Sequence, residues 1–284
     1  MNSRFFNHPE TLARLIRLHA LEMCYASKAS HIGGMFSVAD ILALLYAEIL
    51  RVSPQSAEDP SRDRLVLSKG HAAAALYATL AECGFLPLGE LLDFRKNGSR
   101  LSGHVYSRVA GVEFSTGSLG QGIGVACGMA LAARLDKSGS RAYAIVGDGE
   151  CDEGSVWECA RFAAENELGN FTVIVDDNRM KGGELYTPKV DPFKAWSGFG
   201  WNAIAVDGHD FDALREAFAQ ARESAKPSVI VARTIKGKGV SFMQNEALWH
   251  YRNPDAEVFA RAWRELGGTD ADLLNADNKP KETV

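Results

Sequence analysis

The residues best suited to chemistry in this sequence surround a Gly-Asp-Gly turn. Asp148 lies between Gly147 and Gly149, and Asn178 follows thirty residues later, with Met180 just beyond it. A carboxylate, an amide oxygen and the backbone carbonyl of Met180 are hard oxygen ligands, which suit Mg²⁺ or Ca²⁺ rather than zinc. Because Mg²⁺ usually completes its octahedron with phosphate oxygens and water, a diphosphate is the expected companion. The two glycines leave room for its phosphates to approach the backbone.

Two short apolar runs would position these side chains. The run 142–146 ends two residues before Asp148, and the run 172–176 ends two residues before Asn178, with a helix expected over about 155–168 between them. Parallel α/β sheets bind ligands beyond the carboxyl ends of their strands. If the two runs form neighbouring strands, about 4.8 Å apart, both side chains lie over the same point. A Gly-Asp-Gly sequence alone is usually only a tight turn, and the asparagine at the second strand end is what favours a metal and diphosphate site.

The apolar runs predict an α/β fold with a doubly wound, mostly parallel sheet and helices on both faces. Each run is apolar on consecutive residues rather than alternating, which is typical of strands covered on both sides. Ser37 and Asp210 are expected to cap helices, and Gly84 to end one. We expect one domain over 1–284, with a polar tail over 271–284 that frays. The expected strands are 64–67, 142–146, 172–176, 202–206 and 228–234.

Composition excludes several classes of protein. The 31 Lys and Arg residues against 36 Asp and Glu give a net charge of −5, with no basic cluster of the kind that nucleic acid requires. The first residues lack the apolar core of a signal peptide, and we expect no membrane span of roughly 18 apolar residues, so the sequence favours a cytoplasmic protein. The five cysteines contain no CxxC pair, which predicts reduced and mostly buried thiols at Cys24, Cys83, Cys127, Cys151 and Cys159.

Five stretches in family order carry a resemblance to transketolases. One is the segment from Gly147 to Asn178, which is similar to the thiamine diphosphate motif. The others are SHIGGMFSVADIL, DRLVLSKGHAAAALYATL, SGH followed by GVEFSTGSLGQGIGVACGMA, and ARTIKGKGVSF leading to WH. The resemblance extends from about residue 10 to about residue 255 and covers the diphosphate-binding (PP) domain, so it implies the thiamine diphosphate-binding fold.

The resemblance implies a set of cofactor and substrate residues. Thiamine diphosphate would be held through Mg²⁺ (or Ca²⁺), with Asp148, Asn178 and the backbone oxygen of Met180 as metal ligands. The catalytic histidines of the sugar channel would be His31, His104 and His250. The cofactor itself would be contacted by His71, Gly117, Ser118, Leu119, Gly149, Asn178 and His250.

Some positions depart from the family pattern or stay open. SHIGG stands where GHPG is usual, and Tyr251 puts bulk where WHG has glycine. The acids Glu153 and Glu158 match residues that join subunits, but the interpretation as exposed helical acids is equally favoured. Lys236 and Lys238 could hold a phosphate, but a solvated loop is the favoured interpretation. His8, His19 and His209 are expected to be surface or packing residues.

The resemblance also implies partners. The pyrimidine-binding domain of transketolases has no counterpart in the sequence, so the chain resembles the N-terminal, thiamine diphosphate-binding subunit of a split transketolase, which would be inactive alone. Together with its partner, it would transfer a two-carbon ketol unit from a ketose (phosphate) to an aldose (phosphate). Because cofactor sites in this family form between chains, we expect two copies of this chain assembled with two transketolase C-terminal chains, which carry the pyrimidine-binding domain.

Three alternatives remain from the residues themselves. A deoxyxylulose phosphate synthase or a 2-oxo acid dehydrogenase component shares the metal motif. An NAD-binding oxidoreductase is suggested by LGQGIGVACG, but Val125 and Cys127 occupy the positions where GxGxxG requires its last glycine. A noncatalytic module that kept the fold is the third, and the histidines of the motifs disfavour it.

Overall fold

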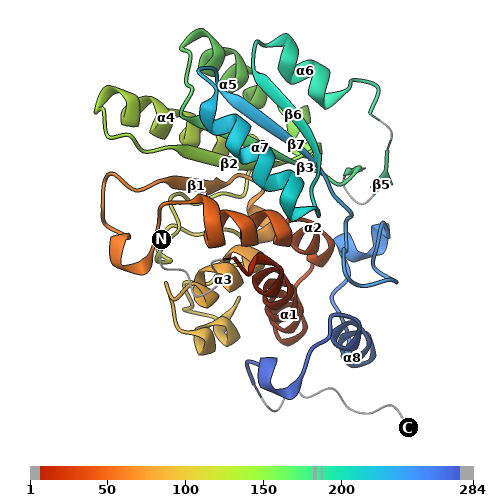
Figure 1. The fold of residues 1–284 in the computed structure, drawn as a ribbon. Helices are drawn as coiled ribbons and strands as arrows, with labels where there is room; N and C mark the ends of the chain where they lie inside the picture. Colours follow the sequence, from red (N-terminus) through yellow and green to blue (C-terminus); the bar gives the residue numbers. More distant parts are fainter. Residues whose placement is uncertain (1–6, 182–183, 187, 276–284) are drawn as a thin grey trace.

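A five-stranded parallel sheet forms the centre of the computed structural model, which describes residues 7–181, 184–186 and 188–275. The strand order is β1-β2-β3-β7-β6 (Figure 1). All five expected strands are present, each within one residue of its predicted ends. Their bounds are β1 Arg64–Leu67, β2 Ala142–Gly147, β3 Phe171–Asp177, β6 Asn202–Asp207 and β7 Ser228–Arg233. A separate antiparallel pair consists of β4 Met180–Lys181 and β5 Glu184–Leu185.

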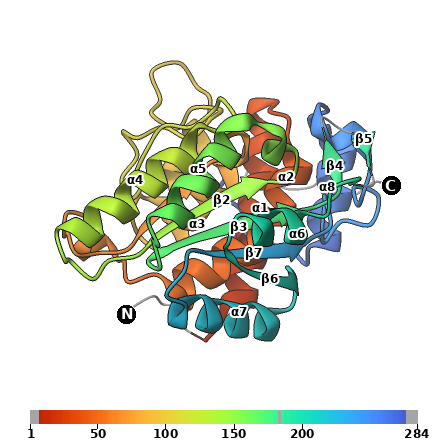
Figure 2. The ribbon, with the colours of Figure 1, turned by 90° about the horizontal axis from the view of Figure 1, so that it is seen from above.

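Helices cover both faces of this sheet, as expected for a doubly wound fold (Figures 1 and 2). Side chains alternate between two apolar cores: along β2, Tyr143 and Ile145 join one core, whereas Ala144 and Val146 join the other. This is why the strands are apolar on consecutive residues. The first core contains α1 Pro9–Ser27, α2 Ile32–Leu44, α3 Ala73–Glu82, α7 Phe211–Glu223 and α8 Ala256–Glu265. The second contains α4 Gln121–Leu135, α5 Gly154–Glu165 and α6 Pro192–Gly198.

The predicted helix ends hold in two cases and fail in one. Asp210 caps α7 by accepting from two backbone N–H groups, and Gly84 follows α3 with a φ of +84°. Ser37 is not a cap, because α2 begins five residues earlier, at Ile32. Its hydroxyl is buried inside the helix and donates to Asp176 Oδ2 at 2.6 Å. The serine therefore donates a hydrogen bond to a buried carboxylate of the sheet and does not cap a helix.

Helix α2 continues through a π-helical turn, Leu45–Ile49. Together they give a segment, Ile32–Ile49, that is long and apolar enough to cross a membrane by length and composition alone. The expectation that no such segment exists was wrong. The segment is 89% buried inside the protein, and α2 packs against α1, α3 and α7, so the core accounts for its apolar composition.

The last described residues are attached to the domain. The backbone N–H groups of Leu274 and Asn275 donate to Glu22, and Leu273 packs on the first core. Fraying was therefore wrongly expected for 271–275, whereas the rest of the predicted tail lies outside the described residues. The five cysteines are free thiols, three of them buried and two half-buried, in line with the prediction.

Candidate active site

The carboxyl ends of β2 and β3 bring the two key residues of the sequence together. The strands are parallel neighbours, with Gly147 opposite Asp176, and Asp148 N–H donates to the carbonyl of Asp176. Asp148 and Asn178 are both buried and line one cavity of about 250 Å³. The predicted convergence of these two side chains is confirmed. Of the other sequence-predicted residues, His31, His71, His104, Gly117, Leu119, Gly149 and His250 line the same cavity.

Asp148 has an unused ligand atom. Its Oδ1 accepts from Gly149 N–H at 2.9 Å, but its buried Oδ2 has no hydrogen-bond partner among the described residues. Burial raises the pKa of Asp148 to about 6, and the charges of Asp176 and Asp177 add to the effect. A buried carboxylate oxygen without a partner is costly unless a cation compensates it. The atom and its electrostatics therefore fit a divalent cation.

The rest of the donor set has the chemistry of a hard-cation site. Asn178 Oδ1 accepts from Met180 N–H at 3.1 Å and keeps a second lone pair. Met180 is buried and pairs with Leu185, but it does not line the cavity, so its backbone carbonyl stays a prediction as the third oxygen. In the described part of the chain, no group of three or more His, Cys, Asp or Glu side chains could hold a metal. A zinc-type site is thus absent there, and one carboxylate with amide and carbonyl oxygens suits Mg²⁺ or Ca²⁺.

The cavity floor contains a buried ion pair that sequence reasoning missed. Lys69 lines the cavity and donates from Nζ to Asp176 Oδ2 at 2.5 Å and to the Gly34 carbonyl at 3.1 Å. Ser37 and Thr234 also donate to this carboxylate. Burial acts to raise the pKa of Asp176, but these donors, above all Lys69, hold it below its usual range. The available signal was Lys69 directly after the apolar run 65–67 and beside His71.

Glu150 is a second buried acid without a predicted role. Its carboxylate accepts from Ser68 Oγ at 2.5 Å, Gly120 N–H at 2.9 Å and Gly147 N–H at 3.1 Å. These contacts join the end of β1, the start of α4 and the end of β2. Burial raises the pKa of Glu150, and all three donors oppose the rise. The acid fixes the backbone around the Gly-Asp-Gly turn and leaves Asp148 free to face the cavity.

Three histidine rings form a cluster over the cavity. The ring centroids lie 5.0 Å apart for His31 and His250, 5.4 Å for His31 and His71, and 6.2 Å for His71 and His250. His31 has left-handed backbone geometry, φ 73°, just before α2, and its N–H donates to the His250 carbonyl at 3.0 Å. Burial is the main cause that lowers the pKa of all three, to about 4 for His250 and well below the ordinary value for His71. The cluster is neutral near pH 7.

Lys236 belongs to the site and does not lie in a solvated loop. It is only 4% exposed, lines the cavity, and places Nζ 3.0 Å from His250 Nδ1. Burial, then the charge of Lys69, lowers the pKa of Lys236 to about 8. Since an ammonium only donates, His250 Nδ1 accepts and its proton resides on Nε2. The favoured interpretation of this loop was wrong for Lys236, because its side chain packs against Gly33, whereas Lys238 is half-buried outside this cavity.

A buried chain of polar contacts supports the Lys236 loop. His209 Nε2 accepts from Ile235 N–H at 2.8 Å, and its Nδ1 lies 2.6 Å from Asp40 Oδ2. Asp40 also accepts two hydrogen bonds from Arg17, at 2.9 and 2.5 Å. His209 is thus the packing residue that was expected, and it holds the backbone next to Lys236.

The remaining predicted residues are placed as follows. Ser118 is exposed and lies between Gly117 and Leu119 without lining the cavity itself. The backbone of His104 is fixed by hydrogen bonds from Tyr77 and Ser102 to its carbonyl. Tyr251 is 69% exposed, so its bulk does not displace His250 from the cavity. His19 is buried against Glu82, whereas His8, Glu153 and Glu158 are exposed, which leaves both readings of the two acids open.

The fold and this cavity define a class of protein: an α/β domain with a parallel sheet and an oxygen-rich ligand site at the carboxyl ends of its central strands. Residues 9–272 match the family model described as transketolase, thiamine diphosphate binding domain. The chain therefore belongs to the transketolase family.

Individual relatives differ in length. Human transketolase is 42% identical over 243 residues, which cover 84% of this chain but only 38% of the human enzyme. The 6-deoxy-6-sulfo-D-fructose transketolase subunit SqwG of a Clostridium species is 41% identical, covering 89% of this chain and 94% of that one. One of the apulose-4-phosphate transketolase subunits of Phocaeicola vulgatus is 38% identical, with 88% and 90% covered. This chain thus spans well under half of the full-length enzyme and nearly all of the two separate subunits.

Solved structures of transketolases also match this chain over less than half of their own length. Transketolase from Campylobacter jejuni superimposes with a TM-score of 0.86 at 30% identity, covering 98% of this chain and 45% of that one. Transketolase from Leishmania mexicana gives a TM-score of 0.85 at 30% identity, covering 95% of this chain and 43% of that one. The expected thiamine diphosphate-binding fold is confirmed.

Proposed function

We propose that this chain is the thiamine diphosphate-binding subunit of a two-subunit transketolase, and that residues 1–284 form a single domain for the diphosphate and its metal. The observation that carries the proposal is the unpartnered Oδ2 of Asp148, buried beside Asn178 in a cavity that also holds a histidine cluster. Relatives of the same length that are named as transketolase subunits support it.

The cofactor would be held through its charged end. Asp148, Asn178 and the Met180 carbonyl would bind Mg²⁺ (or Ca²⁺), and the diphosphate would lie against His71 and Gly149. Lys69 and Lys236, the two cations of the cavity, supply further positive charge there. The segment from Gly117 to Leu119 would contact the rings. When bound, the cofactor supplies a nucleophilic carbon that stores electrons from a cleaved C–C bond.

The histidines would orient the sugar and move its protons. Neutral imidazoles can both donate and accept near pH 7. Lys236 holds His250 with its proton on Nε2, so this nitrogen presents a donor to a hydroxyl or carbonyl oxygen. His31 and His104, which line the same cavity, would contact the remaining hydroxyls. The residues of this chain thus position the sugar while a second chain completes the site.

The partner, the assembly, the location and the substrates belong to the same proposal. The partner would be a transketolase subunit with the pyrimidine-binding domain, assembled as two copies of each chain in the cytoplasm, without nucleic acid or membrane. Substrates would be a ketose and an aldose, one or both phosphorylated. Because two subunit relatives are named for unusual sugars, sulfofructose and apulose phosphate belong in the substrate panel.

Reconstitution tests the proposal. The chain, its partner, thiamine diphosphate and Mg²⁺ are mixed with a ketose donor and ribose 5-phosphate, and the two-carbon-extended product is measured. Activity should require both chains and should be lost in His31→Ala, with Lys96→Gln, an exposed lysine outside the cavity, as control. Release of carbon dioxide from a 2-oxo acid, without ketol transfer, would contradict the proposal.

A further inference from the structure

A second cavity lies at the opposite end of the sheet. Its volume is about 530 Å³, and it is lined by Arg141 before β2, by Gly169 and Asn170 before β3, and by the ends of α4 and α7. Five of its ten lining residues are cations and none is an acid. The whole chain is net negative, so this concentration of positive charge is local. The cations are Arg51, Arg134, Lys137, Arg141 and Arg222.

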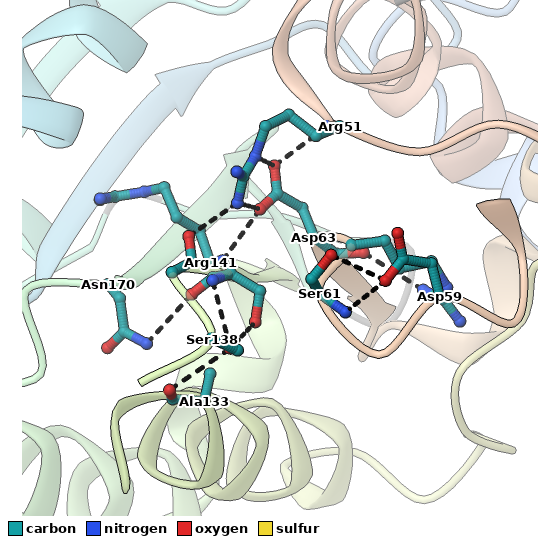
Figure 3. A network of polar contacts seen from close by, with 11 residues as sticks. Arg51, Asp59, Ser61, Asp63, Ala133, Ser138, Arg141 and Asn170 are labelled. Atoms are coloured by element: carbon teal, nitrogen blue, oxygen red, sulfur yellow. Dashed lines mark hydrogen bonds and ion pairs between the residues drawn. The ribbon is translucent and has the colours of Figure 1, made fainter. Parts of the chain in front are cut away.

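Part of this cluster is a rigid frame, shown in Figure 3. Asp63 accepts from Arg51 Nη2 at 2.8 Å and from the Arg141 backbone N–H at 2.9 Å, which joins the two arginines. Arg51 also donates to the Gly139 carbonyl at 2.7 Å. Asp63 is buried and offsets about one of the positive charges. The walls of the cavity are therefore fixed by hydrogen bonds before any ligand binds.

The remaining charge is not compensated. Lys137 and Arg222 are exposed and form no ion pair or side-chain hydrogen bond within the described residues. Arg141 donates from Nη2 to two carbonyls, but its buried Nε has no partner in that same part of the chain. Within the described residues, Arg134 donates only to the Asn166 carbonyl. Four cations thus line the cavity without an ion pair to a carboxylate in that part of the chain.

Helix dipoles explain the positions of two of these cations but not the convergence. Arg134 and Arg222 lie in the last turns of α4 and α7, where a positive charge is favourable. That effect acts on each helix separately. It does not require two helix ends to meet Arg51, Lys137 and Arg141 around one hollow, where like charges repel.

We propose that this cavity binds a small, multiply phosphorylated anion. Arginine forks match phosphate oxygens in pairs, and lysine adds a point charge. The volume falls within the range of small-molecule sites. The six residues of β2 separate this cavity from Asp148 by roughly 20 Å, so the anion would not compete with substrate or cofactor. The site is an effector or anchoring site, whatever reaction the other end of the sheet performs.

Calorimetry of the full chain tests the inference, with thiamine diphosphate and Mg²⁺ saturating the first cavity and bisphosphoglycerate as the probe. Wild type should bind one equivalent. The double variant Lys137→Gln, Arg222→Gln should bind about tenfold more weakly, because two charged contacts are lost. A double variant of equal charge, Lys96→Gln, Lys194→Gln, removes exposed cations elsewhere and should bind within about twofold of wild type.

Three results would overturn the inference: no saturable binding by wild type, equal weakening in both double variants, or unchanged binding in the first. Equal urea midpoints verify that the variants fold, as expected for exposed side chains of which, in the described part of the chain, only Lys96 forms an ion pair, itself exposed, with Asp93. Hydrogen exchange gives a second, variant-free test. The probe should protect amides of segments 134–141 and 169–170, and protection only at other segments would place the anion elsewhere.

Discussion

Lys236 predicts an unusual pH dependence of cofactor affinity. Its pKa is lowered to about 8 by burial and by Lys69, so its charge changes close to physiological pH. A group with this pKa is ~90% charged at pH 7 and ~10% charged at pH 9. If the ammonium contacts the diphosphate, the bound state stabilises the charged form, and affinity falls as pH rises above the pKa of the free site. The expected loss between pH 7 and pH 9 is therefore about tenfold.

The assay is a calorimetric titration of the assembled subunits with thiamine diphosphate at constant Mg²⁺, at pH 7, 8 and 9. Lys236→Met should bind weakly at every pH, with no such fall. Lys238→Met, two residues away and outside the cavity, should keep the wild-type profile. A wild-type affinity that is constant up to pH 9, or an equal fall in Lys236→Met, would refute the reasoning.

The same lysine should act on stability in the opposite direction. Because its pKa in the folded chain lies below the unfolded value of 10.5, the unfolded chain binds more protons between about pH 8 and that value. This group therefore adds stability to the cofactor-free chain as pH rises through that window. In urea denaturation, the unfolding free energy of wild type minus that of Lys236→Met should increase as pH rises from about 8 to about 10.5.

Three other substitutions test the site and its supports. Asp148→Asn should abolish Mg²⁺-dependent cofactor binding in calorimetry, while the urea midpoint of the cofactor-free chain stays equal or rises, because an unpartnered buried carboxylate is removed; a lower midpoint would contradict this. Arg17→Met should cost about 3 kcal/mol of unfolding free energy, because buried Asp40 loses its arginine partner and keeps, among the described residues, only its contact with His209. Arg14→Met, which breaks a partly exposed pair on the same helix, should cost under about 1 kcal/mol, and equal losses would refute the comparison. Gly70→Ala should cost about 1–3 kcal/mol, since its Cβ would lie 2.5 Å from a backbone carbonyl, and an unchanged midpoint would show that the loop can shift.

The strands and the meeting of Asp148 with Asn178 could be predicted because their causes are local. Consecutive apolar residues specify strands buried on both faces, and two such strands joined by one helix are commonly parallel neighbours. The position of β7 between β3 and β6 could not be predicted, because nothing in those segments specifies the order of strands.

The errors have a common physical origin in packing between distant segments. Lys236 lies next to a glycine in a basic loop, and its contact with Gly33, some two hundred residues earlier, is what buries it. Ser37 was predicted to be a helix cap because its real partner, Asp176, lies on a strand far away in sequence and could not be identified from the local pattern. Lys69 was overlooked for the same reason, since its counter-charge is this same Asp176.

Helix α2 is synthesised long before one of the helices that packs on it. One of the elements that covers it, α7, begins about 170 residues after α2 ends. At roughly 5–20 residues per second, the side of α2 that packs on α7 waits about 8–35 s for this partner, whereas α1 and α3 are already available. Nascent chains should therefore expose only the α7-facing side of this apolar segment during that interval.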